Sequence, residues 1–151
     1  MRRGAGATQL PVASRDAILI DTGLLVALFD RREPLHAAAR AWLAAVREPL
    51  WSVPSVWAEA AHFLPGRLRV ALARAAAQGV VKTSAPDAAG YGRVATLLDR
   101  YADLDPDWTD AELIWLAEST GIRRIATLDA ADFSIYRIHG RSAFDIVWPP
   151  R

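Results

Sequence analysis

The fold of this chain is indicated first by one stretch, Ala17-Ile18-Leu19-Ile20-Asp21-Thr22-Gly23-Leu24-Leu25-Val26-Ala27-Leu28-Phe29. An apolar run reaches a single carboxylate, Asp21, a small turn follows, and a second apolar run begins. Apolar runs on both sides predict a buried strand that leads into a buried helix. Because open α/β sheets bind ligands at the carboxyl ends of parallel strands, Asp21 is expected to be either a helix cap or part of a site.

The composition is that of a globular chain in the size range of one domain. Of its 151 residues, 52% are hydrophobic and 23% are charged, and the net charge is only +1, so any nucleic-acid contact requires a local positive potential. The absence of cysteine excludes disulfides and cysteine-based sites and fits a reducing cytoplasm. No apolar run reaches transmembrane length, so we expect a cytoplasmic protein without a membrane partner. Residues 1–15 are interpreted as a flexible leader and residues 16–151 as a single domain.

Strand and helix signals alternate along the chain. Helices are predicted over residues 34–46, 55–64, 67–78, 87–101 and 109–120. Further extended segments are predicted over residues 50–53, 80–82, 124–127, 134–138 and 144–148. This alternation is typical of a parallel sheet with crossover helices, so we expect an α/β fold.

Glu59 places a carboxylate on a predicted apolar stripe. Helical spacing puts it on one face with Val56, Ala60 and Phe63, in a helix that Ser55 is expected to cap. An unpaired buried carboxylate is costly. Glu59 is therefore expected to form a buried salt bridge, to lie at the margin of the stripe, or to bind a metal ion.

Asp110 repeats this pattern, because the residues three, four and seven positions later are apolar. The segment also matches a capping box, with Thr109 as the N-cap and Glu112 reaching back to it, so Glu112 is left out of the candidate site. The helix dipole favours an acid in the first turn, which explains the position of Asp110 but not its apolar neighbours.

Asp129 completes a set of four acids. It follows a predicted strand, as Asp21 does, and can cap the next helical turn, whereas Asp132 is expected to be solvated. Strand ends and the N-termini of the following helices share one edge of a parallel sheet, so Asp21, Glu59, Asp110 and Asp129 are predicted to converge there. Clustered carboxylates need a counter-charge, and oxygen ligands without His or Cys favour Mg²⁺ or Mn²⁺ over zinc. This donor set suits phosphodiester hydrolysis.

Four segments carry a family resemblance: DTGLLVAL at 21–28, VWAEA at 56–60, TDAELIWLAE at 109–118 and IATLDAADF at 125–133. Through them the chain resembles the PIN-domain family, and within it the VapC-type ribonuclease toxins of bacterial toxin–antitoxin pairs. The resemblance covers roughly residues 17–148 and keeps the family's order and spacing. It implies a three-layer α/β/α sandwich with a mainly parallel sheet, RNA cleavage with Mg²⁺ or Mn²⁺, a homodimer and an inhibitory antitoxin protein.

The resemblance also implies roles for particular residues. The catalytic and metal-binding acids are those at positions Asp21, Glu59, Asp110 and Asp129. Thr127 matches a polar position that can hydrogen-bond a ligand or the scissile phosphate.

Three further residues are candidates for substrate contact. Thr22 follows the first acid, and Arg31 and Arg32 follow the first helix.

Bulky residues depart from the family pattern. Trp57, Trp108 and Trp115 stand where aliphatic residues are usual, and core packing is the default interpretation, with a narrowed cleft or base stacking as alternatives. Glu112 stands where a small or hydroxyl residue is frequent.

Two other functions fit parts of the sequence. The same fold can be a non-catalytic scaffold that binds RNA or protein, with the acids as helix caps, although the intact set of four acids argues against it. The sequence Asp21-Thr22-Gly23 also occurs in retroviral-type aspartic proteases. That fold is all-β, whereas here the motif opens a long apolar helix.

Overall fold

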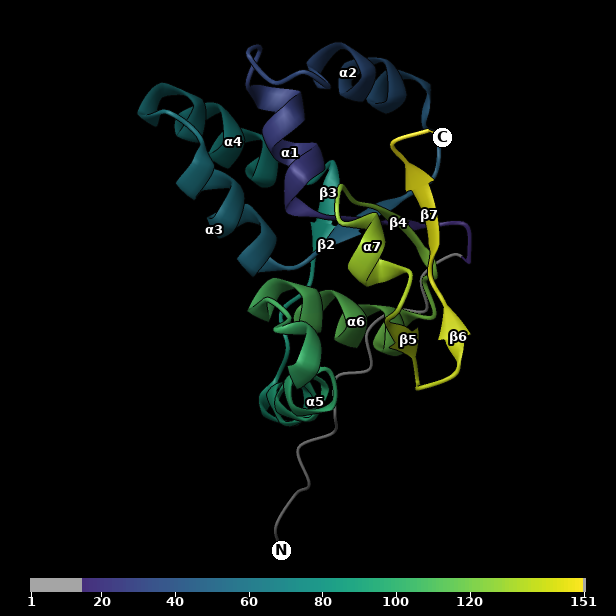
Figure 1. Ribbon diagram of the computed structural model, residues 1–151. Helices are drawn as coiled ribbons and strands as arrows, with labels where there is room; N and C mark the ends of the chain where they lie inside the picture. The colour runs from purple at the N-terminus through teal and green to yellow at the C-terminus, as the bar shows by residue number, and fades with distance from the viewer. Residues whose placement is uncertain (1–14, 151) are drawn as a thin grey trace, which may run out of the picture.

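A five-stranded sheet forms the centre of the protein in the computed structural model, which describes residues 15–150 (Figure 1). The strand order is β3-β2-β1-β4-β7, and every neighbouring pair is parallel. The five strands are β1 (Ile18–Ile20), β2 (Leu50–Ser52), β3 (Val81–Thr83), β4 (Arg124–Ala126) and β7 (Asp145–Trp148). The predicted parallel sheet is therefore confirmed, while the leader predicted for residues 1–15 lies, except for Arg15, outside the described residues.

Helices cover both faces of this sheet. The first group packs together on one side (Figure 1) and comprises α1 (Thr22–Phe29), α2 (His36–Ala45), α3 (Pro54–Phe63) and α4 (Gly66–Gln78). The second group lies on the other side and comprises α5 (Ala88–Arg100), the 3₁₀ turn η1 (Ala102–Leu104) and α6 (Trp108–Thr120). The short helix α7 (Ala130–Phe133) and an antiparallel pair, β5 (Arg137–Ile138) and β6 (Ser142–Ala143), precede β7. The architecture is the expected three-layer α/β/α sandwich.

Strand β1 lies in the middle of the sheet because its whole sequence is apolar. Its three residues are buried, and β2 and β4 pair with it on either side. Ile20 pairs with Ala126, so β1 and β4 end in register. The backbone N–H of Asp21 then donates to the carbonyl of Ala126 at 3.0 Å. This register brings the residues that follow the two strands to one edge of the sheet.

Two predicted helix starts are wrong. Ser55 lies inside α3, whose N-cap is Val53 and whose first residue is Pro54, a residue suited to the first helical turn because it lacks an N–H. Thr109 lies inside α6, whose N-cap is Asp107. The Ser55 and Thr109 side chains, predicted to be helix caps, are therefore available for contacts with other parts of the fold.

Helix α6 is buried on almost every side. Its residues from Thr109 to Ala117 are buried, because the helix lies between the sheet and α5. Helix α5 approaches it closely at Gly90, where a Cβ would come within 2.8 Å of the Trp115 indole nitrogen. A helix covered in this way places any acid in its sequence out of water.

Across residues 15–150, none of the helices combines the length and apolar character needed to cross a membrane.

Candidate functional site

A cleft of about 330 Å³ opens at the carboxyl edge of the sheet. Its lining comes from α1, the loop after it, α3, the start of α6, and the segment between β4 and α7. The lining residues are Asp21, Thr22, Gly23, Val26, Glu33, Glu59, Phe63, Asp107, Asp110, Leu128 and Asp129. Six of these eleven carry a carboxylate, and none is Lys, Arg or His. The four acids expected to converge therefore lie in one cleft.

Asp21 is both a helix cap and a wall of the cleft. Its Oδ1 accepts from the backbone N–H of Thr22 at 2.7 Å, and its Oδ2 accepts from the Thr127 hydroxyl at 2.6 Å. Burial raises the pKa of Asp21 to about 6, and the charges of Glu59 and Asp129 add to this rise although both hydrogen bonds oppose it. Asp21 therefore lacks a cation that would stabilise its charge.

Thr127 holds two of the acids. Its hydroxyl donates to Asp21 and accepts from the backbone N–H of Asp129 at 3.0 Å. The backbone N–H of Thr127 donates in turn to the carbonyl of Trp148 on β7. The side chain is fully buried and already bonded, so its position suits orientation of the acids, and the substrate contact expected from the sequence stays a prediction.

Glu59 reaches the cleft from α3. It is half-buried, and its Oε2 accepts from the Thr22 hydroxyl at 3.1 Å. The apolar stripe predicted around it is only partly correct, because Val56 and Ala60 are buried but Phe63 is 59% exposed. Glu59 thus lies at the margin of the stripe, and because it lines the cleft this position also leaves it able to bind a metal ion. Thr22 joins it to Asp21 through one backbone and one side-chain contact.

Asp110 is the most strongly perturbed acid. It is 4% exposed on the first turn of α6, and its Oδ2 accepts from the Tyr136 hydroxyl at 3.0 Å. Burial raises its pKa to about 8, with Asp21 as the next largest cause. The pKa of Tyr136 is also raised, first by burial and then by the charge of Asp110. The neutral hydroxyl thus compensates Asp110 only in part.

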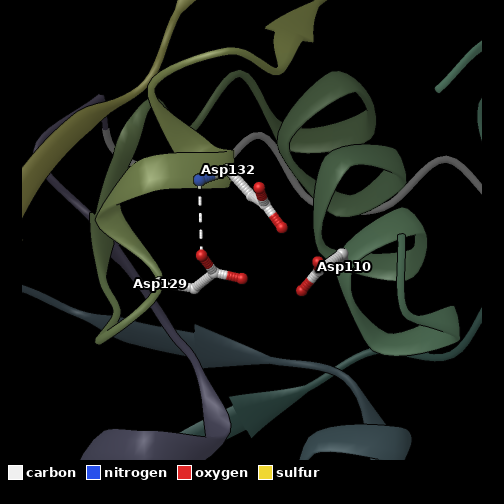
Figure 2. Close-up of side chains that lie close together, drawn as sticks. All are labelled: Asp110, Asp129 and Asp132. Atoms are coloured by element: carbon white, nitrogen blue, oxygen red, sulfur yellow. Dashed lines mark hydrogen bonds between the residues drawn. The ribbon is translucent and has the colours of Figure 1, made fainter. Parts of the chain in front are cut away.

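Asp132 joins Asp110 and Asp129 in a compact group. One carboxylate oxygen from each lies within 4.8 Å of the others, a spacing that can hold a metal ion (Figure 2). Figure 2 shows Asp132 on α7 turned toward Asp110, while Asp129 accepts from the backbone N–H of Asp132 at 3.3 Å. Asp132 was expected to be solvated, but it is half-buried, and its pKa is raised mainly by burial and then by Asp129. The only signal for it in the sequence is its three-residue spacing from Asp129.

Glu112 does not form the predicted capping box. It is buried, and it accepts from the Ser55 hydroxyl on α3 at 2.5 Å and from the Trp108 indole N–H at 2.8 Å. Glu112 therefore connects the helix that carries Glu59 with the helix that carries Asp110. Both of its carboxylate oxygens are hydrogen-bonded within the protein, and Glu112 is not among the residues that line the cleft.

The three tryptophans differ in environment. Trp115 is buried, as core packing predicts, and Trp57 is half-buried with its indole N–H donated to the Thr83 hydroxyl at 3.0 Å. Trp108 is 55% exposed, so core packing is the wrong interpretation for it.

Asp107, which precedes Trp108, lines the cleft. The pKa of Asp107 is raised by burial and then by Glu59.

Arg31 and Arg32 lie outside the cleft. Both are exposed in the turn after α1. Arg32 forms a two-point ion pair with Asp30, with Nε to Oδ1 at 3.1 Å and an Nη to Oδ2 at 3.0 Å. The structure therefore does not bring these arginines to the acids, and one of them is already paired.

The chemistry of the cleft follows from its charges. Six carboxylates share a small volume, and burial and mutual repulsion raise the pKa values of Asp21, Asp107 and Asp110. Their oxygen atoms are the ligands that hard divalent cations prefer, and a bound cation would offset the repulsion. The residues present thus fit a divalent metal ion.

Comparisons with known proteins agree with this geometry. The family model of the PIN domain matches residues 18–138. Over 134 residues the chain is 31% identical to ribonuclease VapC26 of Mycobacterium tuberculosis, covering 86% of this chain and 99% of that protein. The crystal structure of M. tuberculosis VapC20, a Sarcin-Ricin loop cleaving toxin, matches with a TM-score of 0.68 and 20% identity. The match covers 74% of this chain and 89% of VapC20, and at this identity it supports the fold alone.

Proposed function

The chain belongs to the PIN-domain family, and we propose that its acidic cleft is the active site of a VapC-type ribonuclease. The activity is metal-dependent hydrolysis of RNA phosphodiester bonds. The observation that carries this proposal is the set of six carboxylates in one cleft without a basic side chain among its lining residues. That arrangement is unfavourable in isolation and suits a site built for a divalent cation.

Mg²⁺ or Mn²⁺ is the proposed cofactor, held by Asp21, Glu59, Asp110 and Asp129. The proximity of Asp132 to two of these acids supports adding it to the set. When bound, the cation supplies Lewis-acid stabilisation of the charge that develops on the phosphodiester group. The protein's own acids bind the cation as carboxylates, so its binding releases the protons that burial otherwise retains on Asp21 and Asp110.

The remaining polar groups orient these acids. Thr127 fixes Asp21 and the backbone of Asp129, and Thr22 fixes Glu59. Glu59 is the acid proposed to orient the attacking water and take its proton, because it is half-buried at the cleft wall and accessible to solvent. Thr22 lines the cleft and is kept as a proposed contact with RNA. Thr127 is buried and Arg31 and Arg32 are exposed outside the cleft, and their contacts with RNA stay predictions.

The biological role proposed is that of the toxin in a type II toxin–antitoxin pair. Its relative VapC26 is named a ribonuclease, and VapC20 is described as a toxin that cleaves the Sarcin-Ricin loop. We extend the ribonuclease activity to this chain, with a cognate antitoxin protein, a homodimer and a cytoplasmic location. Residues 16–151 are proposed as one domain, which is supported by one sheet whose strands span residues 18–148.

The test is RNA cleavage by purified protein with and without metal. Wild-type protein is expected to cut structured RNAs in millimolar Mg²⁺ or Mn²⁺ and to lose activity in a chelator. The Asp21→Asn variant, which keeps the shape of the side chain, is expected to be inactive. Intact RNA across several structured substrates, together with no binding of Mn²⁺ by calorimetry at millimolar concentration, would support the non-catalytic scaffold instead.

A further inference from the structure

Two exposed aromatic side chains lie beside the acidic cleft and have no part in the proposed chemistry. Trp108 is 55% exposed and Tyr91 is 43% exposed, and their ring centroids are 6.0 Å apart with a 44° angle between the planes. We call these two residues the aromatic pair. Large exposed rings are costly to leave in water, and paired exposed rings frequently mark a binding surface.

Trp108 is held in place by the buried part of the protein. Its indole N–H donates at 2.8 Å to Glu112, which is itself buried and accepts from Ser55 on α3. An exposed Trp on a flexible segment would sample many orientations. Here one ring edge is bonded to a buried charge, so the ring face keeps a defined orientation without losing its exposure.

Tyr91 is brought to Trp108 by close packing of two helices. Gly90, the preceding residue, allows α5 to approach α6, because a Cβ there would meet the Trp115 indole nitrogen and Pro86 Cβ at 2.8 Å. Asp87 caps α5 by accepting from the backbone N–H of Gly90 at 2.8 Å, which fixes the first turn that carries Tyr91. The pair is therefore built by the geometry of two helix starts, fixed by the Gly90 contact and the Asp87 cap.

The position of the pair relates it to the cleft. Trp108 directly follows Asp107 and precedes Asp110 by two residues, and both acids line the cleft. The lining contains six carboxylates and no basic residue, so it repels the RNA backbone until a cation is bound. Affinity for RNA thus requires contacts that do not depend on phosphate charge, and aromatic faces stack on any nucleobase.

We infer that Trp108 and Tyr91 form a stacking subsite for an unpaired nucleobase of the RNA next to the cleaved bond. The inference rests on the proposed ribonuclease function for its choice of ligand. The bases recognised are those of single-stranded segments or loops, because a base in a duplex does not present its face. The pair acts on substrate binding and leaves the chemical step to the acids.

The test measures RNA binding in the Asp21→Asn background, which separates binding from cleavage. The probes are a fluorescein-labelled 12-mer oligoadenylate and a ribose-phosphate 12-mer of the same length without bases, each in millimolar Mg²⁺, followed by fluorescence anisotropy. Adding Trp108→Ala is expected to weaken binding of the oligoadenylate about tenfold and to leave binding of the abasic oligomer unchanged. Tyr91→Ala is expected to give a smaller loss of the same kind.

Two further variants separate the ring from its support. Trp108→Phe keeps an aromatic face but loses the N–H bonded to Glu112, so an intermediate affinity is expected. Val80→Ala removes a side chain that is 58% exposed at the amino end of β3, at the opposite edge of the sheet from the cleft, and is expected to leave affinity unchanged. In wild-type background, Trp108→Ala is expected to raise KM for a cleaved RNA with little change in kcat.

The result that overturns the inference is equal affinity for oligoadenylate with and without the two alanine substitutions, or an equal loss on the abasic oligomer. Absence of any oligoadenylate binding by both the wild-type and the Asp21→Asn proteins in millimolar Mg²⁺ overturns it as well. Failure of the proposed function looks different: wild-type protein would leave RNA intact while the aromatic variants still lose oligoadenylate affinity. Cleavage by wild-type protein with unaffected aromatic variants would instead retain the function and remove the stacking subsite.

Discussion

Helix α6 carries three acids with buried side chains, and two of them, Asp110 and Glu118, have opposite surroundings. Asp110 in its first turn faces other acids across the cleft, and within residues 15–150 its one side-chain hydrogen-bond donor is the Tyr136 hydroxyl. Glu118, two turns later, is paired with the Arg93 guanidinium and also contacts the His139 ring. Arg93 donates to both of its oxygens at 3.0 and 3.1 Å, and the His139 ring lies 3.1 Å away.

The difference separates an acid that pairs with a basic side chain from one that faces other acids. Burial of a carboxylate is tolerated when the protein supplies the opposite charge, as it does for Glu118. At Asp110 the protein supplies more negative charge, and the pKa rises to about 8. The clustered acids of the cleft therefore lower the stability of the metal-free protein, which is expected of a site that is completed by a ligand.

The largest expected effect is on catalysis at Asp110. Asp110→Asn removes one oxygen ligand and one negative charge without changing the volume of the side chain. We expect RNA cleavage to fall at least about 100-fold, because loss of metal-assisted charge stabilisation is worth several kcal/mol. The measurement is kcat/KM at saturating Mn²⁺.

Glu118→Gln is the matched control for this experiment. It makes the same change of a carboxylate to an amide on the same buried helix, away from the cleft. Its cleavage rate is expected to stay within about twofold of wild type, since the effect of a distant ion pair on the acids is small. Equal loss of activity in both variants would mean that α6 tolerates no change of a buried carboxylate to an amide. The loss in Asp110→Asn could then not be assigned to the metal site.

The second expected effect is a fall in stability with rising pH in metal-free protein. Between the ordinary Asp pKa of 3.8 and the raised values of about 6 for Asp21 and about 8 for Asp110, the native state holds protons that the unfolded state has lost. Stability is therefore highest below this window and falls as pH rises through it. From pH 5 to pH 8.5 the loss is expected to be about 5 kcal/mol, which lowers Tm by roughly 10–20 °C.

Two controls assign this pH dependence to the cleft. Saturating Mg²⁺ or Mn²⁺ is expected to remove most of the fall, because the cation replaces the protons and stabilises the native state by mass action. Metal-free Asp110→Asn keeps the whole Glu118 cluster, His139 included, yet is expected to lose less stability across the same range. A Tm that is constant or increases from pH 5 to pH 8.5 in the wild-type protein would contradict the raised pKa values.

The sequence is sufficient to predict the parts of the site that follow from the parallel direction of the strands. Asp21 and Asp129 follow apolar strands, and parallel strands end at one edge, so their convergence requires only the alternation of elements. The four motif acids of the resemblance also lie in the cleft. Asp132 was missed because its approach to Asp110 depends on how α7, a helix of four residues, is placed over the sheet edge.

Predictions from local motifs are wrong where a side chain bonds a residue distant in sequence instead of its neighbour in the motif. The capping box at Thr109 and Glu112 is a valid local arrangement, but Glu112 instead accepts from Ser55, 57 residues earlier in the chain. The helix therefore begins one residue before Thr109, with Asp107 as N-cap. A tertiary contact also explains why Trp108 is exposed. Its indole N–H donates to the buried Glu112, which holds the ring at the surface and not in the core.

A third, smaller effect is expected on the stability of the Glu118 cluster. Glu118→Gln removes the charge that Arg93 and His139 share. The Arg93 and His139 side chains are 36% and 62% exposed and can be solvated when Glu118 is removed, so the cost is expected to be roughly 1–2 kcal/mol, below the value for a fully buried pair. Thermal unfolding measures it, with Arg93→Lys as a milder variant that keeps the charge and loses the two-point geometry.

The response of Glu118→Gln to metal completes this test. Because the cluster lies outside the cleft, the increase in Tm on adding Mn²⁺ is expected to equal that of wild type. An altered increase would show that the two acids of α6 are coupled, and an unchanged Tm without metal would show that the ion pair contributes nothing to stability.

The smallest expected effect is at Thr22, whose hydroxyl is the neutral partner of Glu59 in the cleft. Thr22→Val removes this hydroxyl and keeps the backbone N–H that donates a hydrogen bond to Asp21. Glu59 is half-buried, so water can replace the lost donor, and we expect kcat/KM to fall about fivefold, equivalent to about 1 kcal/mol. Thr22→Ser, which keeps the hydroxyl, is expected to match wild type, with RNA cleavage at saturating Mn²⁺ as the measurement. If Thr22→Val lowered kcat/KM as much as Asp110→Asn does, one neutral hydrogen bond would matter as much for cleavage as a metal-binding carboxylate. The contrast between Asp110 and Glu118 could then not be explained by the need of Asp110 for a cation.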